Sequence, residues 1–483
     1  MTKAIKSITN PKLHLNILTP QEVKKIHDAT LWIIEKVGIR FPSKRALEIW
    51  AAHGAEVDTG KMVVRAKAEL IEKALKTCPP VYPLAARDPQ QDLSLDGNHV
   101  FVGTDGCGVE VIDIHTSKRR VSSLQDVRDI SRIADATEEV AFHWVPVSAQ
   151  DTPPETRGLH EIKAIWENST KHVQTESIYN AREARAAVEM AGLLAGGKDK
   201  LRQRPVLSLM QCSASPLGHD GGSLEAALVA AEYGIPTGFM TMAANLTTGP
   251  ATLAGNLAVG NAEVIAGAAL IQLAFPGAPV FYAAAQTASD LRTGAYTGGG
   301  PEDFLYGAAT NVLSDFYGIP LSMGSFATGA KEPNWQAGIE NSLSTFMACI
   351  VMSDMLLGVG FLHGSRIWSY AEMMMDCEIF SIIQKTMQGI VVDDETLALD
   401  TISAVGPGGN FLAQKHTLKH MRDLFLPQFM DRRPYNEWEI KKDDARDWAL
   451  AKARNTLETH QPDPLDEKIN LEMTKIIASL ESK

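Results

Sequence analysis

Polar side chains follow a series of short apolar segments, and these are the residues of the sequence best suited to chemistry. In "VFYAAAQTASDLRTG" (residues 280–294), an apolar run too short for a self-contained helix changes abruptly to an amide, hydroxyls and an Asp-Arg pair. The same transition follows seven other apolar runs. The polar residues that follow these eight apolar runs include Asp105, Ser148, Gln150, Glu176, Cys212, Ser213, Ser215, Asn245, Gln286, Ser289, Asp290, Ser325 and His363. Carboxylates, amides and one imidazole suit ligand binding or acid–base chemistry.

Each of these residues also has a purely structural interpretation. Asp290 and Arg292 are more simply explained as an ion pair that fixes their loop. His363 follows a very apolar run, where a hydrogen-bonded core histidine is as compatible with the sequence as a site residue. Glu176 is the most suggestive carboxylate, because it ends an apolar run and is placed for acid–base chemistry or for pairing with a cationic ligand.

Aromatic residues near the same segment ends favour a ligand with a quaternary ammonium group, which aromatic faces bind through cation–π contacts. For most of these positions ordinary packing is the simpler explanation. No spacing indicates a zinc site, no Ser-His-Asp order is convincing, and no lysine ends an apolar run where a Schiff base would form. The aromatic residues are Trp144, Phe239, Tyr282, Tyr296, Phe326, Trp335, Phe361, Trp368 and Tyr370.

The elements that must position these groups are eight short strands alternating with helices. Apolar runs of strand length alternate with helix-length segments, as in βα units with parallel strands. Eight uninterrupted units predict a closed (β/α)₈ barrel, in which the reactive groups lie at the carboxyl ends of the strands. A doubly wound open sheet is the alternative, but its G-x-G-x-x-G fingerprint is missing. The predicted strands lie within 99–106, 140–149, 171–177, 204–215, 235–245, 278–290, 319–329 and 355–364.

Three regions follow from this pattern. Residues 1–98 form an N-terminal helical region, in which Thr19 is the expected N-cap of a helix that begins at Pro20. Residues 99–390 form the barrel, and residues 391–483 form a helical extension.

Composition limits the function classes. The net charge of −12 over 483 residues argues against a nucleic-acid-binding surface. Five widely spaced cysteines, among them Cys107, predict neither a disulfide framework nor a thiolate zinc site. The N-terminus lacks the apolar core of a signal peptide, and the longest stretch of small apolar residues, 257–275, is interrupted by Asn261 and Glu263, which argues against a membrane span. We therefore expect a cytoplasmic protein.

Longer segments resemble the trimethylamine methyltransferase family. These are "LTPQEVKKIHDATLWIIEKVGIRF", "GNAEVIAGAALIQLAFPGAPVFY", "DLRTGAYTGGGPE" and "DDETLALDTISAVGPGGNFL", which follow the family in order along nearly the whole chain. The resemblance implies a (β/α)₈ barrel. It also implies transfer of a methyl group from a methylated amine to the cobalt of a separate corrinoid protein, with no cofactor bound tightly to this chain.

One departure from the family bears on the substrate. The trimethylamine enzymes carry pyrrolysine, whereas "SFATGAKEPNW" contains only ordinary residues, with Gly329 at the expected position. The resemblance is therefore to the pyrrolysine-free branch, which acts on quaternary amines. Glycine betaine, converted to dimethylglycine, is the expected donor, and proline betaine, carnitine and γ-butyrobetaine are alternatives.

The site expected from this resemblance combines a catalytic and a substrate-binding set. Glu176, Gln286 and His363 are the predicted catalytic residues, and no metal is expected. Substrate binding is predicted for Asp105, Tyr282, Arg292, Phe361, Arg366 and Trp368. Two other functions stay open, a barrel lyase acting on a small carboxylate and a non-catalytic quaternary-amine sensor. The oligomeric state is open too, although a homo-oligomer is compatible with a barrel of this size.

Overall fold

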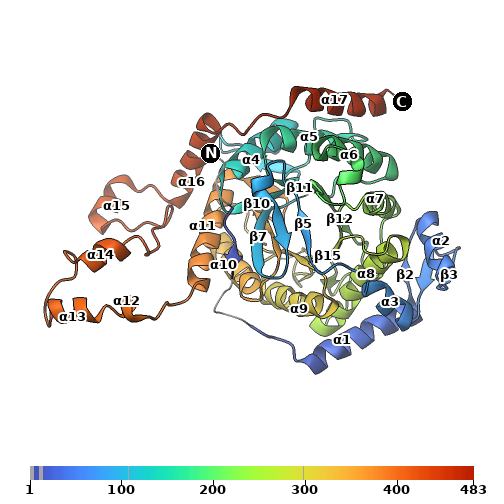
Figure 1. The fold of residues 1–483 in the computed structure, drawn as a ribbon, viewed down its shortest axis with the longest axis horizontal. Helices are drawn as coiled ribbons and strands as arrows, with labels where there is room; N and C mark the ends of the chain where they lie inside the picture. Colours follow the sequence, from blue (N-terminus) through green and yellow to red (C-terminus); the bar gives the residue numbers. More distant parts are fainter. Residues whose placement is uncertain (1–4, 10–14, 107, 297, 483) are drawn as a thin grey trace.

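The centre of the molecule is a closed barrel of eight parallel strands (Figure 1). A computed structural model describes residues 5–9, 15–106, 108–296 and 298–482, so Cys107 lies outside the described residues. Each strand pairs with the next in sequence, and the pairing of β18 with β7 closes the barrel. The strands are β7 (His99–Thr104), β10 (Val140–Trp144), β11 (His172–Thr175), β12 (Leu207–Cys212), β13 (Thr237–Thr241), β15 (Val280–Ala284), β17 (Leu321–Gly324) and β18 (Met355–Val359). All eight predicted strands and the barrel are thus confirmed.

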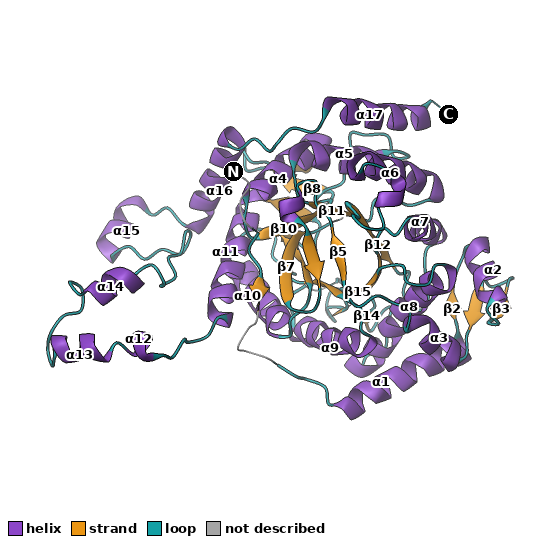
Figure 2. Ribbon diagram, in the orientation of Figure 1, coloured by secondary structure: helices purple, strands orange, loops and turns teal. Residues whose placement is uncertain are grey.

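Helices surround the barrel (Figure 2), so both faces of its strands are buried, and most of these strands are therefore largely apolar. Within β15, for example, Phe281 belongs to the apolar cluster inside the barrel, whereas Tyr282 belongs to the cluster between barrel and helices. The surrounding helices are α4 (Leu124–Ala136), α5 (Arg157–Asn168), α6 (Ala181–Ala195), α7 (Gly221–Glu232), α8 (Leu253–Ala274), α9 (Pro301–Tyr317), α10 (Trp335–Ile350) and α11 (Tyr370–Met387).

Helix α8 is long and apolar enough to cross a membrane by length and composition alone, but 83% of its most apolar stretch is buried. Two of its polar side chains form hydrogen bonds inside the protein. Asn261 donates to the Thr30 hydroxyl at 2.7 Å, and the Glu263 carboxylate accepts from the Thr241 hydroxyl at 2.9 Å. These features are those of a core helix, consistent with a soluble protein.

The N-terminal region contains more β-structure than its sequence predicts. The helices α1 (Pro20–Trp32), α2 (Lys44–Ala52) and α3 (Ala68–Leu75) are present, and Thr19 caps α1 through a reciprocal capping box with Glu22. A small antiparallel sheet of β2 (Ile39–Arg40), β4 (Val63–Arg65) and β3 (Glu56–Asp58) lies among them. Strands of two or three residues have no readable periodicity, so the sequence pattern indicated only the helices of this region.

A hairpin from the N-terminal region supplies side chains to the barrel interior. It consists of β5 (Tyr82–Leu84) and β6 (Leu93–Leu95). Leu84 and Leu93 join the interior cluster that includes Phe101, and the Tyr82 hydroxyl donates to the carbonyl of Val280, the first residue of β15, at 2.9 Å. These contacts lie at the amino ends of the strands, so any accessible site must use the carboxyl ends.

The chain beyond the barrel forms further helices. Helix α16 (Ala445–Thr459) packs against α11 and α4, and α17 (Glu467–Glu481) packs against α5 and α6. Between α11 and α16 the chain makes a long excursion away from the body (Figure 1), which contains α12 (Asp394–Leu397), α13 (Leu399–Val405), α14 (Lys415–His420) and α15 (Tyr435–Lys441).

Candidate active site

A cavity of about 510 Å³ opens at the carboxyl end of the barrel. Asp105 and Glu176 directly follow β7 and β11, and Gln286 is the second residue after β15. These strand ends are where a barrel of this class presents its functional groups. The lining combines three carboxyls with aromatic rings and sulfur-containing side chains. The carboxyls are Asp105, Glu176 and Asp303, the aromatic residues are Trp144, Tyr296 and Tyr306, and the sulfur-containing residues are Cys212, Met240, Met242 and Met323.

The carboxyls give the cavity an anionic interior. Burial raises the pKa of the Asp105 carboxyl to about 6, although hydrogen bonds from the Ser365 hydroxyl at 2.5 Å and the Gly106 amide at 2.9 Å oppose the rise. Burial likewise raises the pKa of Asp303 to about 6. Glu176 is buried, and the Cys212 thiol lies 3.8 Å from its carboxylate. Among the described lining residues, Arg366 is the cation, and its side chain is mostly exposed at the rim. A cationic ligand with apolar substituents matches this lining best.

Four of the nine predicted catalytic and substrate-binding residues line this cavity, namely Asp105, Glu176, Gln286 and Arg366. The amide nitrogen of Gln286 donates to the backbone carbonyl of Asn256 at 2.7 Å, which orients the side chain. Its amide oxygen is buried and has no hydrogen-bond partner among the described residues. This oxygen is therefore a buried acceptor in the cavity wall.

The other five predicted residues lie elsewhere. His363 is exposed outside the lining, and its backbone amide donates to Ala330 at 2.7 Å. Arg292 is exposed and pairs with Asp290 at 3.1 Å, in agreement with the loop-fixing interpretation. The Tyr282 hydroxyl faces α8 and donates to Asn261 at 3.1 Å.

Phe361 and Trp368 are also away from the cavity lining. Both are fully buried, and their rings pack edge-to-face with centroids 5.2 Å apart. Gly329 lies outside the lining as well, where its amide donates to the Glu340 carboxylate at 2.9 Å. None of these three residues belongs to the cavity lining.

Sequence reasoning missed Asp303 and Tyr306, which lie on the first turns of α9. The available signal was "TGGGPEDF", recognised only as a helix start. Gly300 is the N-cap of α9, and its amide donates to the Asp303 carboxylate at 2.9 Å. Asp303 therefore caps the first turn of the helix and also lines the cavity. Trp144 and Tyr296 were noted as aromatic residues near strand ends but were not assigned to the site.

The chain as a whole matches one protein family. Residues 1–482 match the family described as trimethylamine methyltransferase (MTTB). The protein belongs to the trimethylamine methyltransferase family. Trimethylamine methyltransferase MttB of Desulfitobacterium hafniense is 34% identical over 464 residues, which cover 96% of this chain and 93% of that protein. This confirms the resemblance, and the chain is a methyltransferase.

Two further similarities concern other members and a solved structure. Glycine betaine methyltransferase of Desulfitobacterium hafniense is 34% identical over 466 residues, 96% of either chain. The crystal structure of monomethylamine methyltransferase (MtmB) of Methanosarcina barkeri aligns over 91% of this chain and 92% of its own, with 12% identity and a TM-score of 0.48.

In this family member a four-stranded sheet forms part of the cavity rim. Its order is β19 (Phe361–Leu362), β20 (Ile367–Ser369), β8 (Glu110–Ile112) and β9 (Arg119–Val121), so it joins the loops that follow β18 and β7. Arg366 directly precedes β20, and its guanidinium lies 4.0 Å from the Glu110 carboxylate. The position of this sheet therefore determines where Arg366 lies.

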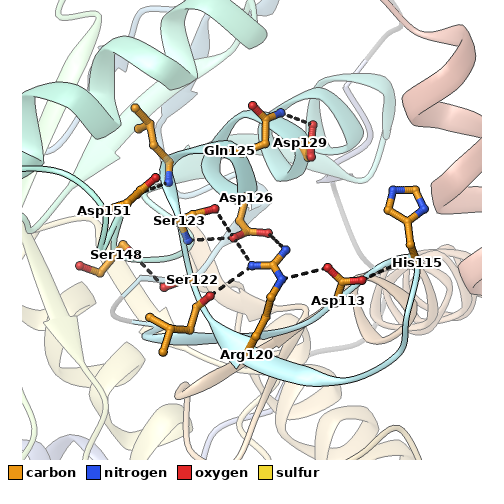
Figure 3. A network of polar contacts seen from close by, with 12 residues as sticks. Asp113, His115, Arg120, Ser122, Ser123, Gln125, Asp126, Asp129, Ser148 and Asp151 are labelled. Atoms are coloured by element: carbon orange, nitrogen blue, oxygen red, sulfur yellow. Dashed lines mark hydrogen bonds and ion pairs between the residues drawn. The ribbon is translucent and has the colours of Figure 1, made fainter.

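A polar network ties the sheet to α4 (Figure 3). The Arg120 guanidinium donates twice to the buried Asp126 carboxylate, at 2.7 Å each, and once to Asp113 at 2.9 Å. These hydrogen bonds raise the pKa of Arg120, and bonds from Thr116 and Arg120 hold the pKa of Asp113 well below its usual range. Asp126 also completes the capping box of α4 with Ser123.

Replacing Arg120 with Gln is expected to destabilise the protein. The change leaves the buried Asp126 carboxylate without its bidentate partner, and because Arg120 is partly exposed we expect a loss of about 1–2 kcal/mol. Thermal unfolding followed by circular dichroism measures the effect. Arg119→Gln is the matched control, because Arg119 is on the same strand, is largely exposed and pairs with Glu110 at 3.4 Å. Equal losses in the two variants would contradict the role given to Arg120.

Proposed function

We propose that this methyltransferase moves a methyl group from a quaternary amine to Co(I) of a corrinoid carried by a separate protein. The observation that carries the proposal is the cavity, in which three carboxyls, aromatic rings and thioethers converge at the carboxyl end of the barrel. Such a lining suits a permanently charged ammonium whose methyl groups are apolar. Family membership supports a methylated amine as donor, and the relative named glycine betaine methyltransferase supports glycine betaine as the first one to test.

The absence of pyrrolysine from the sequence supports a quaternary donor over trimethylamine. In our proposal Gly329 replaces pyrrolysine, and the reaction depends on the substrate's own charge. As the methyl group leaves, the C–N bond breaks and its electron pair remains on nitrogen, so the product is a neutral tertiary amine. The electron pair of the new C–Co bond comes from Co(I), which is oxidised to Co(III). No proton has to be delivered to the leaving group.

The chain's residues would therefore hold the ammonium, orient one N–CH₃ bond towards the mouth and exclude water. Asp105, Glu176 and Asp303 balance the positive charge, and Trp144, Tyr296 and Tyr306 supply aromatic surface in place of the cage expected from the sequence.

Arg366 is the residue that we propose for the carboxylate of a betaine. It lies at the rim, so a donor with its ammonium at the carboxyls would place its carboxylate towards the mouth. The cavity volume of about 510 Å³ is within the range of roughly 300–1,000 Å³ for small-molecule sites, and leaves space for donors larger than glycine betaine.

We also propose that the protein is located in the cytoplasm. The four described cysteines, Cys78, Cys212, Cys349 and Cys377, are free thiols, as is usual for proteins of a reducing compartment.

The function is tested anaerobically with a corrinoid protein reduced to Co(I). Glycine betaine is added, and conversion of the Co(I) absorption band to that of methyl-Co(III) is followed, with trimethylamine, carnitine and proline betaine in parallel. We expect conversion with glycine betaine and none with trimethylamine. Conversion with carnitine or proline betaine alone would keep the reaction and correct the donor. Binding of a quaternary amine by calorimetry without conversion would favour the sensor function instead.

The affinity for a quaternary amine is expected to depend on pH. Asp105 and Asp303 have raised pKa values of about 6, so they are mostly protonated at pH 5 and mostly ionised at pH 7. Because only the ionised forms attract the cation, Kd should fall about tenfold over this interval. Calorimetric titration without corrinoid protein measures Kd directly. The Asp105→Asn/Asp303→Asn double variant should have a nearly flat profile, and an unchanged slope in that variant would contradict the assignment.

A further inference from the structure

The turn between β19 and β20 combines an unfavourable backbone conformation with a contact to the cavity. Residues 363–366 connect these two antiparallel strands, and His363, Gly364 and Ser365 have φ angles of +56°, +64° and +58°. Glycine adopts this left-handed conformation readily, whereas a residue with a Cβ is disfavoured there. Two of the three residues carry a Cβ, so the local sequence alone does not favour this turn.

Contacts outside the turn hold it in this conformation. The His363 amide donates to the carbonyl of Ala330 at 2.7 Å, and the Gly364 amide donates to the carbonyl of Thr328 at 2.9 Å. The Thr328 hydroxyl in turn donates to the Glu340 carboxylate of α10 at 2.5 Å. Strained backbone that the surrounding structure imposes in this way is concentrated at functional sites.

The conformation of Ser365 has a definite consequence at the cavity. Its hydroxyl donates to Oδ2 of Asp105 at 2.5 Å, while the Gly106 amide donates to Oδ1 of the same carboxylate at 2.9 Å. The contact joins the loop after β19 to the loop after β7, 260 residues earlier in the chain. A hydroxyl–carboxylate hydrogen bond of this length is charge-assisted and favours the ionised carboxyl. Both oxygens of the Asp105 carboxylate are thus held in place.

The same turn forms part of the cavity wall. Gly364, Ser365 and Arg366 all line the cavity. A Cβ at Gly364 would lie 3.6 Å from Cδ1 of Tyr296, so the turn packs beside this aromatic ring. The turn therefore places a hydroxyl on a carboxylate of the cavity and, one residue later, a guanidinium at its rim.

We propose that Ser365 is a positioning residue, which holds the Asp105 carboxylate in the orientation that binds the ammonium group of the donor. The inference rests on the proposed function and extends it to a residue that acts through Asp105. Glycine at position 365 would relieve the backbone strain but would lack the hydroxyl. A serine at this position therefore lowers the stability of the fold and in return fixes the orientation of the carboxylate.

The variant Ser365→Gly separates this role from a purely structural one. It removes the hydroxyl and relieves the strain of the left-handed backbone, so its midpoint of urea unfolding should equal that of wild type or exceed it. Its Kd for glycine betaine, measured by calorimetry at pH 6.5 without corrinoid protein, should nevertheless rise about tenfold. In methyl transfer the change should appear in KM for the donor, with kcat at saturating donor nearly unchanged.

Ser117→Gly is the matched control. It makes the same substitution at a φ of +56°, in the turn between β8 and β9, where Ser117 is exposed and does not line the cavity. Its unfolding midpoint should change in the same direction, and its Kd should equal that of wild type. In an Asp105→Asn background, the further change Ser365→Gly should alter Kd by less than about twofold, because the two residues act as one unit.

The pH profile of Kd is an independent readout. The hydroxyl opposes the rise in the pKa of Asp105 that burial causes, so its removal should raise this pKa further. The effect of Ser365→Gly on Kd should therefore be larger at pH 6 than at pH 8, where the carboxyl is ionised in both proteins. The other titratable groups that line the cavity are unchanged in the variant, namely Glu176, Cys212, Tyr296 and Asp303.

Three results would overturn the inference alone. They are a wild-type Kd in Ser365→Gly, a loss of affinity that persists in full in the Asp105→Asn background, and an equal loss in Ser117→Gly. A lower unfolding midpoint for Ser365→Gly than for wild type would assign the serine a structural role and would also overturn it. A wild-type protein that binds none of the quaternary amines would overturn the proposed function, and this inference with it.

Discussion

Replacing Glu176 with Gln is expected to lower kcat/KM for a quaternary amine by about 100-fold, equivalent to about 2.7 kcal/mol. Glu176 is buried in the cavity wall directly after β11, beside Trp144, so its carboxylate meets the ammonium with little screening by water. Gln keeps the shape of the side chain and removes only its charge. Most of the loss should therefore appear in Kd and KM.

The measurement combines steady-state methyl transfer with calorimetric binding of the donor. Glu189→Gln is the matched control, because Glu189 lies on α6, the helix after the same strand, and is half exposed on the outer surface. Its kinetics should equal those of wild type. A Glu176→Gln enzyme with wild-type Kd and KM would remove this carboxylate from the ligand site.

Replacing Gly358 with Ala is expected to cost at least about 3 kcal/mol of folding stability. Gly358 lies in β18 with a φ of +126°, which L-residues rarely adopt, and a Cβ there would be 2.0 Å from the backbone oxygen of Ser325. The clash is with main chain of the neighbouring strand end, so no side-chain rotation relieves it. Since Ser325 lines the cavity, any variant that folds should also lose donor affinity.

Urea unfolding of the purified variant, or its yield of soluble protein, measures this effect. Gly338→Ala is the control, because a Cβ at Gly338 meets no atom within 4 Å and alanine is the better helix former in α10. That variant should be as stable as wild type or slightly more stable. Equal stability of Gly358→Ala and Gly338→Ala would contradict the strain argument.

The barrel was predictable because its strands are buried on both faces. Most of these strands are largely apolar, and the chain becomes polar where it reaches the mouth of the barrel. That transition located Asp105, Glu176 and Gln286 at the cavity without any knowledge of the structure. The small sheet of the N-terminal region had no comparable signal, since its strands are only two or three residues long.

The direction of each side chain was not predictable from the same runs. In a strand with one buried face, alternation of apolar and polar residues identifies the inner side. In β15 both sides are apolar, so nothing in the sequence distinguishes Phe281, which points into the barrel, from Tyr282, which points to α8. Tyr282 was predicted for the aromatic cage, whereas in the structure its hydroxyl donates to Asn261 of α8.

What the sequence determined by itself is the order of strands and helices, the barrel, the family and the carboxylates at the strand ends. Only the tertiary structure decided that Asp303 and Tyr306 of α9 complete the cavity and that the sheet of β8 and β20 places Arg366 at its rim. It also decided that residues 390–443 project away from the ring of helices. The reason is physical: local sequence sets where an element begins and ends, whereas the path of a loop and the packing of distant elements set which side chains meet.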